Sequence, residues 1–238
     1  MIAAVVNAVV VAVGCLIGML LGGRLQEKHT KTIVTGLGLC TMVIGISSSL
    51  NTANILVVIV CLVVGTIIGE LLKIEQRLDS LGDWLKARVA KKGGGRFTEG
   101  FVTASLLFCV GSMAIMGSFD AGLRADYTTI FTKSALDTVM AVTFGATMGI
   151  GVMFSGLTIL VYQGALTLLA GVLEPLLSAV VVTEMSAVGG TLIVAIAINM
   201  LGLSKTKIKV GNMLPAMFLP IAYIPLAHWL SEVCSSLF

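Results

Sequence analysis

Several uncharged runs, each close to the length of a membrane-spanning helix, constrain this chain more than any other feature of its sequence. A helix crosses the hydrocarbon core of a bilayer with about 20 apolar residues. The runs raise the hydrophobic fraction of the 238 residues to 57% and leave only 11% charged. Soluble domains do not have such a composition. We therefore expect an all-α, polytopic bundle of transmembrane helices that lies in a lipid bilayer.

We predict about eight spans. Basic residues follow the first run and none precede it, which is the reverse of the charge order of a signal peptide, so we count that run as a span. The expected spans are Ile2–Gly22, Ile33–Leu50, Ile55–Leu72, Phe101–Ser118, Ser134–Phe154, Gly156–Leu177, Glu184–Leu203 and Met213–Leu230.

The basic residues predict the orientation. With the spans counted in this way, 13 of the 15 Lys and Arg residues fall on one side of the membrane, after the first, third and seventh spans. Cytoplasmic loops carry such an excess. We therefore expect a protein of the bacterial inner membrane with both termini outside.

We predict that the chain consists of two related halves at an offset of about 130 residues. Residues 1–72 form a first membrane repeat of three spans, and residues 134–203 form a second. Between them lie a polar segment, 73–96, and the central span with its outer loop, 97–133. A basic loop and a last span with Pro215, Pro220 and Pro225 occupy 204–238. A crossing central span makes the halves parallel and a re-entrant one makes them inverted; the charge distribution favours crossing.

The polar segment from Lys73 to Lys92 has apolar residues at spacings of three and four, with charges on the other face. This pattern predicts an amphipathic helix at the cytoplasmic membrane surface, with Trp84 at the headgroup boundary. The helix either rests on anionic lipid or docks a partner protein. Gly93, Gly94 and Gly95 then form a flexible joint.

Glycines four residues apart predict close helix packing. They occur at Gly14/Gly18/Gly22, Gly65/Gly69 and Gly145/Gly149, and each set places a groove on one helix face into which a neighbouring backbone fits.

Polar residues in or beside the spans are the candidates for a solute or ion pathway, because each needs a partner in a low-dielectric setting. Asp137, three residues after Ser134, has the spacing of a helix capping box, and Glu184 follows Thr183 in the same setting. Each carboxylate either caps a helix or faces an outer cavity where it binds a proton or cation. Glu70 can also reach the interface, and Asp120 is a cap or an entrance residue. The full candidate set is Asn7, Glu70, Ser105, Ser112, Asp120, Asp137, Gln163, Glu184, Asn199 and Asn212.

With these boundaries no Lys or Arg falls within a span, whereas carboxylates lie at span ends. We therefore expect a pathway for cations, protons or neutral solutes, unless helix N-termini hold an anion.

Enzyme chemistry is not indicated. The five cysteines are isolated, and no HExxH, Cys/His ligand spacing or Ser/His arrangement occurs. We expect no catalytic residue, no metal, no cofactor and no nucleic-acid partner.

Several motifs together resemble a known family. They are Asn7, GELLKIE from Gly69, FVTASLLFCVGSMAIMGS from Phe101, Asp137, Tyr162-Gln163-Gly164, EMSAVGG from Glu184, Asn199 and NMLPA from Asn212. On these, the chain resembles the YqgA/YdfK-like bacterial membrane proteins, a domain-of-unknown-function family, over nearly its whole length. The resemblance implies a multi-span inner-membrane protein of transporter type and specifies no activity.

We conclude that the chain is a transporter or channel for a small cation or neutral solute, with proton coupling as one form of this mechanism. The alternative is a membrane scaffold or sensor that acts through the amphipathic helix and transports nothing. Assembly into a homo-oligomer is compatible with either function.

Overall fold

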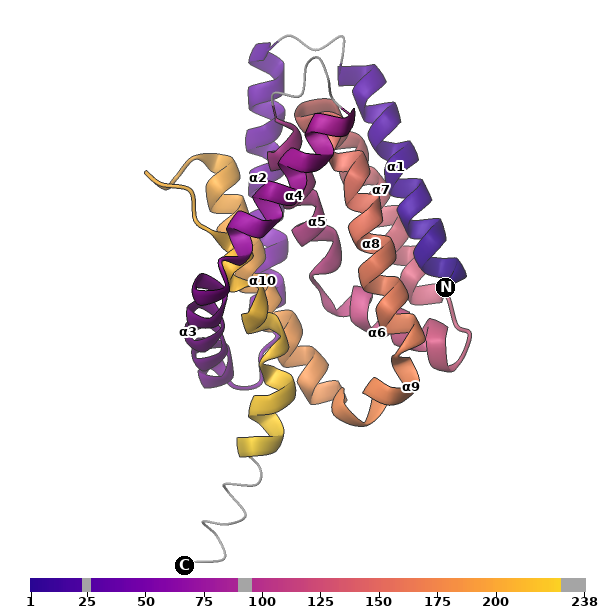
Figure 1. Cartoon of the computed structure of the whole chain (residues 1–238), viewed down its shortest axis with the longest axis vertical. Coiled ribbons are helices and arrows are strands. Elements are labelled where there is room, and N and C mark those ends of the chain that lie inside the picture. Colours follow the sequence, from indigo (N-terminus) through magenta and orange to yellow (C-terminus); the bar gives the residue numbers. More distant parts are fainter. Residues whose placement is uncertain (23–26, 90–95, 228–238) are drawn as a thin grey trace, which may run out of the picture.

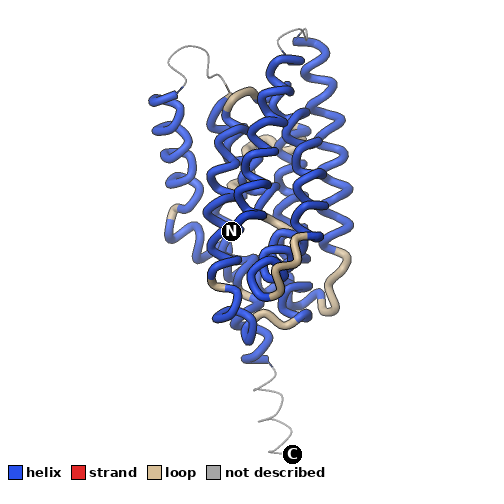
Figure 2. The backbone as a smooth tube through the Cα atoms, turned by 90° about the vertical axis from the view of Figure 1, so that its right-hand side faces the viewer, coloured by secondary structure: helices blue, strands red, loops and turns tan. Residues whose placement is uncertain are grey.

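The apolar runs fold into long helices that lie side by side, as Figure 1 and Figure 2 show. The computed structural model describes residues 1–22, 27–89 and 96–227, and within these ranges it contains helices and connecting loops and no strand. The longer helices are α1 (Ile2–Gly22), α2 (Glu27–Ser49), α3 (Ile55–Leu72), α4 (Ile74–Val89), α5 (Phe97–Cys109), α6 (Ser112–Leu123), α7 (Thr128–Met148), α8 (Gly151–Leu168) and α10 (Ala179–Leu201). Shorter elements are α9 (Ala170–Leu173), η1 (Glu174–Leu176) and η2 (Val210–Phe218), and a helix over 220–227 continues from η2.

Six described segments are long and apolar enough to cross a membrane: Ile2–Gly22, Lys31–Ser49, Ile55–Leu72, Gly151–Leu168, Ala179–Leu201 and Val210–Ala227. The bent pair of α5 and α6 meets the same test together. Helix α7 does not, although its 21 residues make it as long as α1, against which it packs. The fold is thus a polytopic helix bundle, as predicted.

The central span is broken, which corrects the prediction of one continuous helix from Phe101 to Ser118. Helices α5 and α6 meet at an angle of 60° around Val110 and Gly111. The backbone of Phe97 touches Gly151 at the start of α8, and Gly122 near the end of α6 touches Thr167 near the end of α8. Because the pair follows α8 from one end to the other, its path is that of a crossing segment and not of a re-entrant loop.

Several other predicted boundaries are wrong. The predicted spans 134–154 and 156–177 do not exist as such, because α7 ends at Met148 and Gly149, with φ +78°, turns the chain into α8. Helix α7 also begins six residues before Ser134, because polar residues at its start remain helical. Towards the C-terminus, α10 begins at Ala179, five residues before the predicted Glu184. The last span begins as the 3-10 helix η2, which contains Pro215, and the end of its predicted range lies outside the described residues.

The loop after α10 and the corner between α3 and α4 lie at the same end of the bundle, because Lys209 pairs with Glu70 and Lys207 with Glu75. Helix α4 is the predicted amphipathic helix. It buries Gly82 and Leu85 and leaves Trp84 half exposed beneath the Arg88 guanidinium, whose central carbon lies 4.4 Å from the ring centroid. Arg24, Lys91, Lys92 and the triple-glycine joint lie outside the described residues.

The predicted glycine patterns in α1 and α3 mark close helix contacts. The predicted Gly145/Gly149 groove is wrong, because Gly149 ends α7 with φ +78° and a Cβ there would meet nothing within 4 Å. Gly14, Gly18 and Gly22 of α1 face residues 138–146 of α7 in ascending order, so the two helices run parallel. Gly65 and Gly69 of α3 contact Ala216 and Asn212 of η2 equally closely, but in descending order, so these two segments run antiparallel. Figure 1 shows α3 beside this C-terminal segment.

The predicted internal duplication stays a prediction. Helices α1 and α7 open the two halves, run parallel and pair residues 130 apart, such as Asn7 with Asp137. In a duplicated fold, α8 would correspond to α2 and α10 to α3. Helix α2 packs along α10, however, whereas the corresponding pair, α8 and α3, is not a major contact of the bundle.

Replacing Gly18 with alanine tests the close packing. An added Cβ would overlap the Val142 carbonyl, and such overpacking costs about 1–3 kcal/mol. We expect Gly18→Ala to lower the apparent unfolding temperature of the purified protein in detergent. Gly36→Ala is the matched control, because a Cβ there meets nothing within 4 Å and alanine favours a helix by about 1 kcal/mol over glycine. Equal stability of both variants would contradict the assigned packing.

Candidate functional site

Two opposite charges lie inside the bundle, one turn apart on α7. The Lys133 ammonium contacts the Asp137 carboxylate, and their side chains are 7% and 11% exposed. Asp137 lies nine residues after the first residue of α7, roughly 14 Å along the helix axis. The capping-box interpretation of Ser134 and Asp137 is therefore wrong: both residues are well inside the helix, and the Ser134 hydroxyl donates to the Ile130 carbonyl.

Two amides from other helices complete this cluster. The Asn7 side-chain amide on α1 donates to Asp137 Oδ2 at 3.1 Å and to Gln163 Oε1, on α8, at 3.2 Å. Both amide residues are fully buried. Asn7 Oδ1 and Gln163 Nε2 have no hydrogen-bond partner among the described residues. Buried polar atoms are rarely left in this state, so the cluster has unused capacity for a water molecule or a solute.

The charged pair borders a cavity of about 230 Å³, which we call the outer cavity. Lys133 and Asp137 line it, and most of the other lining side chains are apolar: Leu107, Phe108, Met140 and Ile193 are examples. Ser48, next to the last residue of α2, also lines it. The outer cavity therefore lies in the half of the bundle that is remote from the basic loops.

The helix break opens onto the same cavity. Val110 and Gly111 line it, and Gly111 has φ +129°, a conformation that favours glycine. Helix α6 starts there without a side-chain cap, so its first N–H groups depend on other partners.

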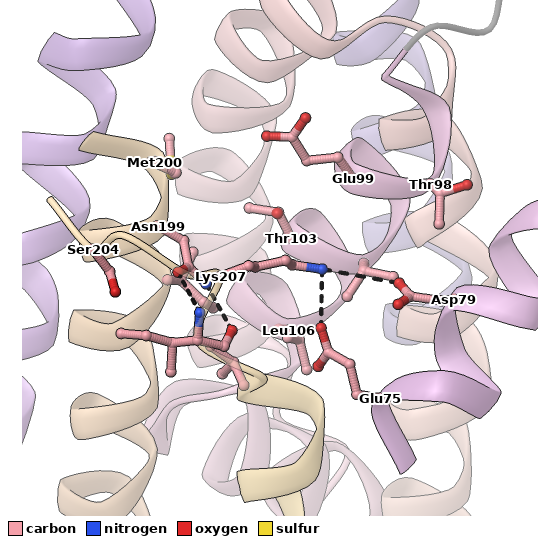
Figure 3. Close-up of a pocket in the computed structure, with 14 residues that line it drawn as sticks. Glu75, Asp79, Thr98, Glu99, Thr103, Leu106, Asn199, Met200, Ser204 and Lys207 are labelled. Atoms are coloured by element: carbon pink, nitrogen blue, oxygen red, sulfur yellow. Dashed lines mark hydrogen bonds and ion pairs between the residues drawn. The ribbon is translucent and has the colours of Figure 1, made fainter. Parts of the chain in front are cut away.

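A second cavity, of about 450 Å³, lies at the basic end of the bundle, and we call it the vestibule. It lies between α4, α5, α10 and the loop after α10, as Figure 3 shows. Glu75, Asp79 and Glu99 contribute carboxylates to its wall and Lys207 an ammonium. Burial raises the pKa of Asp79 although Lys207 opposes the shift. Burial lowers the pKa of Lys207, but the hydrogen bond to Glu75 and the charges of Glu75, Asp79 and Glu99 together outweigh this effect, so the net pKa is raised.

One buried apolar layer separates the two cavities. On α5, Leu106 lines the vestibule and Leu107 lines the outer cavity. On α10, Ile196 lines the vestibule and Ile193, one turn away, lines the outer cavity. These four side chains are at most 9% exposed, so the layer closes the path between the cavities in this conformation.

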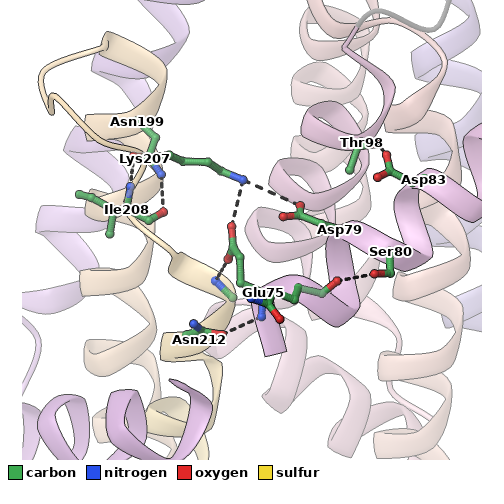
Figure 4. A network of polar contacts seen from close by, with 11 residues as sticks. Glu75, Asp79, Ser80, Asp83, Thr98, Asn199, Lys207, Ile208 and Asn212 are labelled. Atoms are coloured by element: carbon green, nitrogen blue, oxygen red, sulfur yellow. Dashed lines mark hydrogen bonds and ion pairs between the residues drawn. The ribbon is translucent and has the colours of Figure 1, made fainter. Parts of the chain in front are cut away.

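A polar clamp holds the vestibule's rim, as Figure 4 shows. Glu75 accepts hydrogen bonds from the Gly211 N–H at 2.6 Å and from Lys207 at 2.9 Å. Asn212 accepts from the Glu75 N–H at 2.7 Å and donates to Glu70. The clamp thus fastens the corner between α3 and α4 to the start of η2.

The other candidate residues lie apart from the charged pair. Glu184 does not cap its own helix, whose cap is Ser178; it accepts from the N–H groups of Ala53 and Asn54 and from the Thr52 hydroxyl, before α3. Asn199 makes two hydrogen bonds of 2.8 Å with the Ile208 backbone.

Among the remaining candidates, Ser105 pairs with Thr158 on α8 at 3.0 Å. Asp120 pairs with Arg124 at the C-terminal end of α6. Ser112 is the first residue of α6, and the environment of its side chain is not described.

The structure brings Asn7, Asp137 and Gln163 together, and it adds Lys133, which sequence reasoning placed in an outer loop. The expectation of spans without Lys or Arg did not anticipate a lysine buried inside the bundle on α7, a helix that does not itself meet the span test. A signal was present in the sequence, because Lys133 precedes Asp137 by four residues, the spacing of an ion pair on one helix face. Glu75, Asp79 and Glu99 of the vestibule were also missed, because they sit outside the apolar runs.

Comparisons with known proteins agree with this architecture. Residues 2–224 match the family described as Protein of unknown function (DUF554). The chain is 28% identical to the "Uncharacterized membrane protein YdfK" of Bacillus subtilis (strain 168), over 96% of this chain and 97% of that protein. It is also 28% identical to the "Uncharacterized protein YqgA" of Escherichia coli (strain K12), over 90% of this chain and 92% of that protein. No solved structure matches the chain.

Substitutions at the charged pair test whether it is buried as described. Asp137→Asn leaves the Lys133 ammonium buried without a counter-charge, a change that costs about 3–5 kcal/mol. We expect a marked fall in the apparent unfolding temperature. The double variant Lys133→Met with Asp137→Asn removes both charges and keeps an acceptor for Asn7, so it should regain more than half of the lost stability. Equal loss in the single and double variants would contradict the pairing.

Proposed function

Because the chain belongs to the family described as Protein of unknown function (DUF554) and is similar to a protein named as a membrane protein, we propose that it transports a small solute. Its membrane is the bacterial cytoplasmic membrane. The observation that carries the proposal is the pair of cavities on opposite sides of one apolar layer, the outer of which holds a buried Lys–Asp pair.

The chemistry of the two cavities suits this function. A charge inside a membrane bundle is costly and usually marks a solute or ion pathway. Lys133 and Asp137 form the solute site, together with the amides of Asn7 and Gln163, and the vestibule with its carboxylates leads to the cytoplasm. The fold needs neither charge for packing, since apolar residues of similar size would fill the same space.

The break between α5 and α6 supplies the moving part. A helix interrupted at Gly111 can change its bend without breaking its remaining hydrogen bonds, because Val110 is extended and Gly111 has φ +129°, so the helix is already interrupted there. A change of bend moves Leu106 and Leu107 relative to α10 and opens the apolar layer. Solute access then alternates between the outer side and the vestibule.

The orientation follows the positive-inside rule. The described basic residues of α4, of the segment before α5 and of the loop after α10 surround the vestibule end, so this end faces the cytoplasm in our proposal. Helix α4 then lies at the cytoplasmic headgroup boundary, where exposed Leu81 and Trp84 contact lipid. The alternative, a scaffold that acts through α4 alone, does not explain why a charged pair is buried in the bundle.

Accessibility of an engineered thiol tests the transport cycle. In a variant without native cysteines, Met113→Cys places a thiol in the outer cavity. We expect a membrane-impermeant maleimide to label it from the outside in whole cells and, in the alternate conformation, from the cytoplasmic side in inverted vesicles.

Two matched positions serve as controls for this labelling. Thr103→Cys, in the vestibule, should react from the cytoplasmic side. Val43 on α2 is 68% exposed, so the thiol of Val43→Cys should face lipid and react from neither side. Labelling of Met113→Cys from one side under every condition would contradict alternating access.

Single cysteines in exposed loops test the orientation. In intact cells, Asp126→Cys, between α6 and α7, should be labelled by the impermeant maleimide. Ser204→Cys, after α10, should be labelled only once the membrane is permeabilised. The reverse pattern would invert the proposed topology.

A further inference from the structure

We propose that the outer cavity binds a small zwitterion, a molecule that carries one ammonium and one carboxylate a few bonds apart. This inference rests on the proposed function, since it names the class of solute for the same site. It replaces the preference for cations that the sequence suggested, because that preference assumed spans without lysine.

The first argument is charge balance. Lys133 and Asp137 carry opposite charges, so the empty site is neutral as a pair. A bound cation would give Asp137 two positive partners and leave one uncompensated charge, and a bound anion at Lys133 would do the same with the opposite sign. An uncompensated charge away from water is costly. A zwitterion adds one charge of each sign and keeps the total at zero.

The second argument is geometry. Lys133 and Asp137 are one turn apart on α7, and both line the outer cavity. A ligand between them can place its carboxylate on the Lys133 ammonium and its ammonium on Asp137, so that one ion pair becomes two. The uncapped start of α6 at Gly111 borders the same cavity, and its N–H groups and dipole favour the carboxylate end.

The third argument is the unused hydrogen-bonding capacity beside Asp137. Asn7 Oδ1 can accept and Gln163 Nε2 can donate, and neither has a partner among the described residues. An ammonium has three protons to donate, so Asp137 alone does not satisfy it. Asn7, which is hydrogen-bonded to this carboxylate from behind the residues that line the cavity, carries an acceptor that is still free within the described part of the chain.

Size and lining restrict the ligand further. The cavity of about 230 Å³ is smaller than the range of about 300–1,000 Å³ for drug-sized ligands. Leu107, Phe108, Met140 and Ile193 leave its remaining wall apolar. A compact zwitterion with no side chain or a short aliphatic one, such as a small amino acid, fits these limits.

Thermal unfolding of the purified full-length protein in lipid nanodiscs tests the inference, because a ligand that binds the native state raises its stability. The probes are glycine, L-alanine, β-alanine and L-valine. Ethylammonium and propionate, at the same concentrations, serve as comparisons, because each carries only one of alanine's two charged groups. We expect at least one zwitterion to stabilise the protein with an apparent affinity at least tenfold above that of either half molecule.

Variants assign the binding to the outer cavity. The double variant Lys133→Met with Asp137→Asn should fold and lose the zwitterion shift. Asp126→Asn, which removes an exposed carboxylate outside the cavity, should keep it. Stabilisation by ethylammonium equal to that by alanine, a shift that survives in the double variant, or no shift with any zwitterion would each overturn the inference.

The outcomes separate this inference from the proposed function. If Met113→Cys shows two-sided access while every zwitterion fails, transport stands and the solute class is wrong. If zwitterions bind but Met113→Cys reacts from one side only, the site stands and transport is wrong.

Discussion

The burial of Lys133 against Asp137 is the interaction around which α1, α7 and α8 are arranged. Taking two charges out of water costs several kcal/mol per ion, and mutual attraction offsets this cost only when the partners are close and otherwise hydrogen-bonded. The bundle meets these conditions with helices from both halves of the chain: α7 supplies both charges, α1 supplies Asn7 and α8 supplies Gln163. The parallel packing of α1 on α7 through Gly14, Gly18 and Gly22 brings Asn7 to the height of Asp137. Close glycine packing and buried polarity are thus two parts of one arrangement.

The same arrangement explains the broken central span. A continuous helix from Phe97 to Leu123 would pass the outer cavity without offering it any backbone group. The interruption at Val110 and Gly111 places the start of α6 in the wall of the cavity that Lys133 and Asp137 also line. On the other side of the apolar layer, the clamp formed by Glu70, Glu75 and Asn212 holds the vestibule's rim in place. In our proposal, α5 and α6 move, while the charged pair on one side of the apolar layer and the clamp on the other side stay in place.

Much of this architecture follows from the sequence, because apolar runs of span length have few alternatives to a helix bundle. The close contacts at the glycine patterns, the amphipathic helix α4 and the involvement of Asn7, Asp137 and Gln163 were predictable from spacing and polarity. Lys133 was not, because an apolar window rejects a helix start such as TTIFTK, although tertiary partners keep it helical and buried. The break at Gly111 was also missed, since glycine occurs at many positions in these helices and only the packing around α6 distinguishes this one. Glu184 could not be assigned from local sequence either. Its carboxylate accepts hydrogen bonds from Thr52, Ala53 and Asn54, which lie about 130 residues away, and capping rules apply only to residues close together in the sequence.

The central claim is that a charged Lys133 and Asp137 lie in contact inside the membrane. Solid-state nuclear magnetic resonance of the protein in lipid bilayers measures this directly, with ¹⁵N-labelled lysine and ¹³C-labelled aspartate, and with Lys133→Met to assign the signal. The account predicts a protonated Lys133 ammonium with a through-space correlation to the Asp137 carboxylate carbon and slow exchange with water. A neutral amine, no correlation with Asp137, or exchange as fast as that of a surface lysine would contradict it.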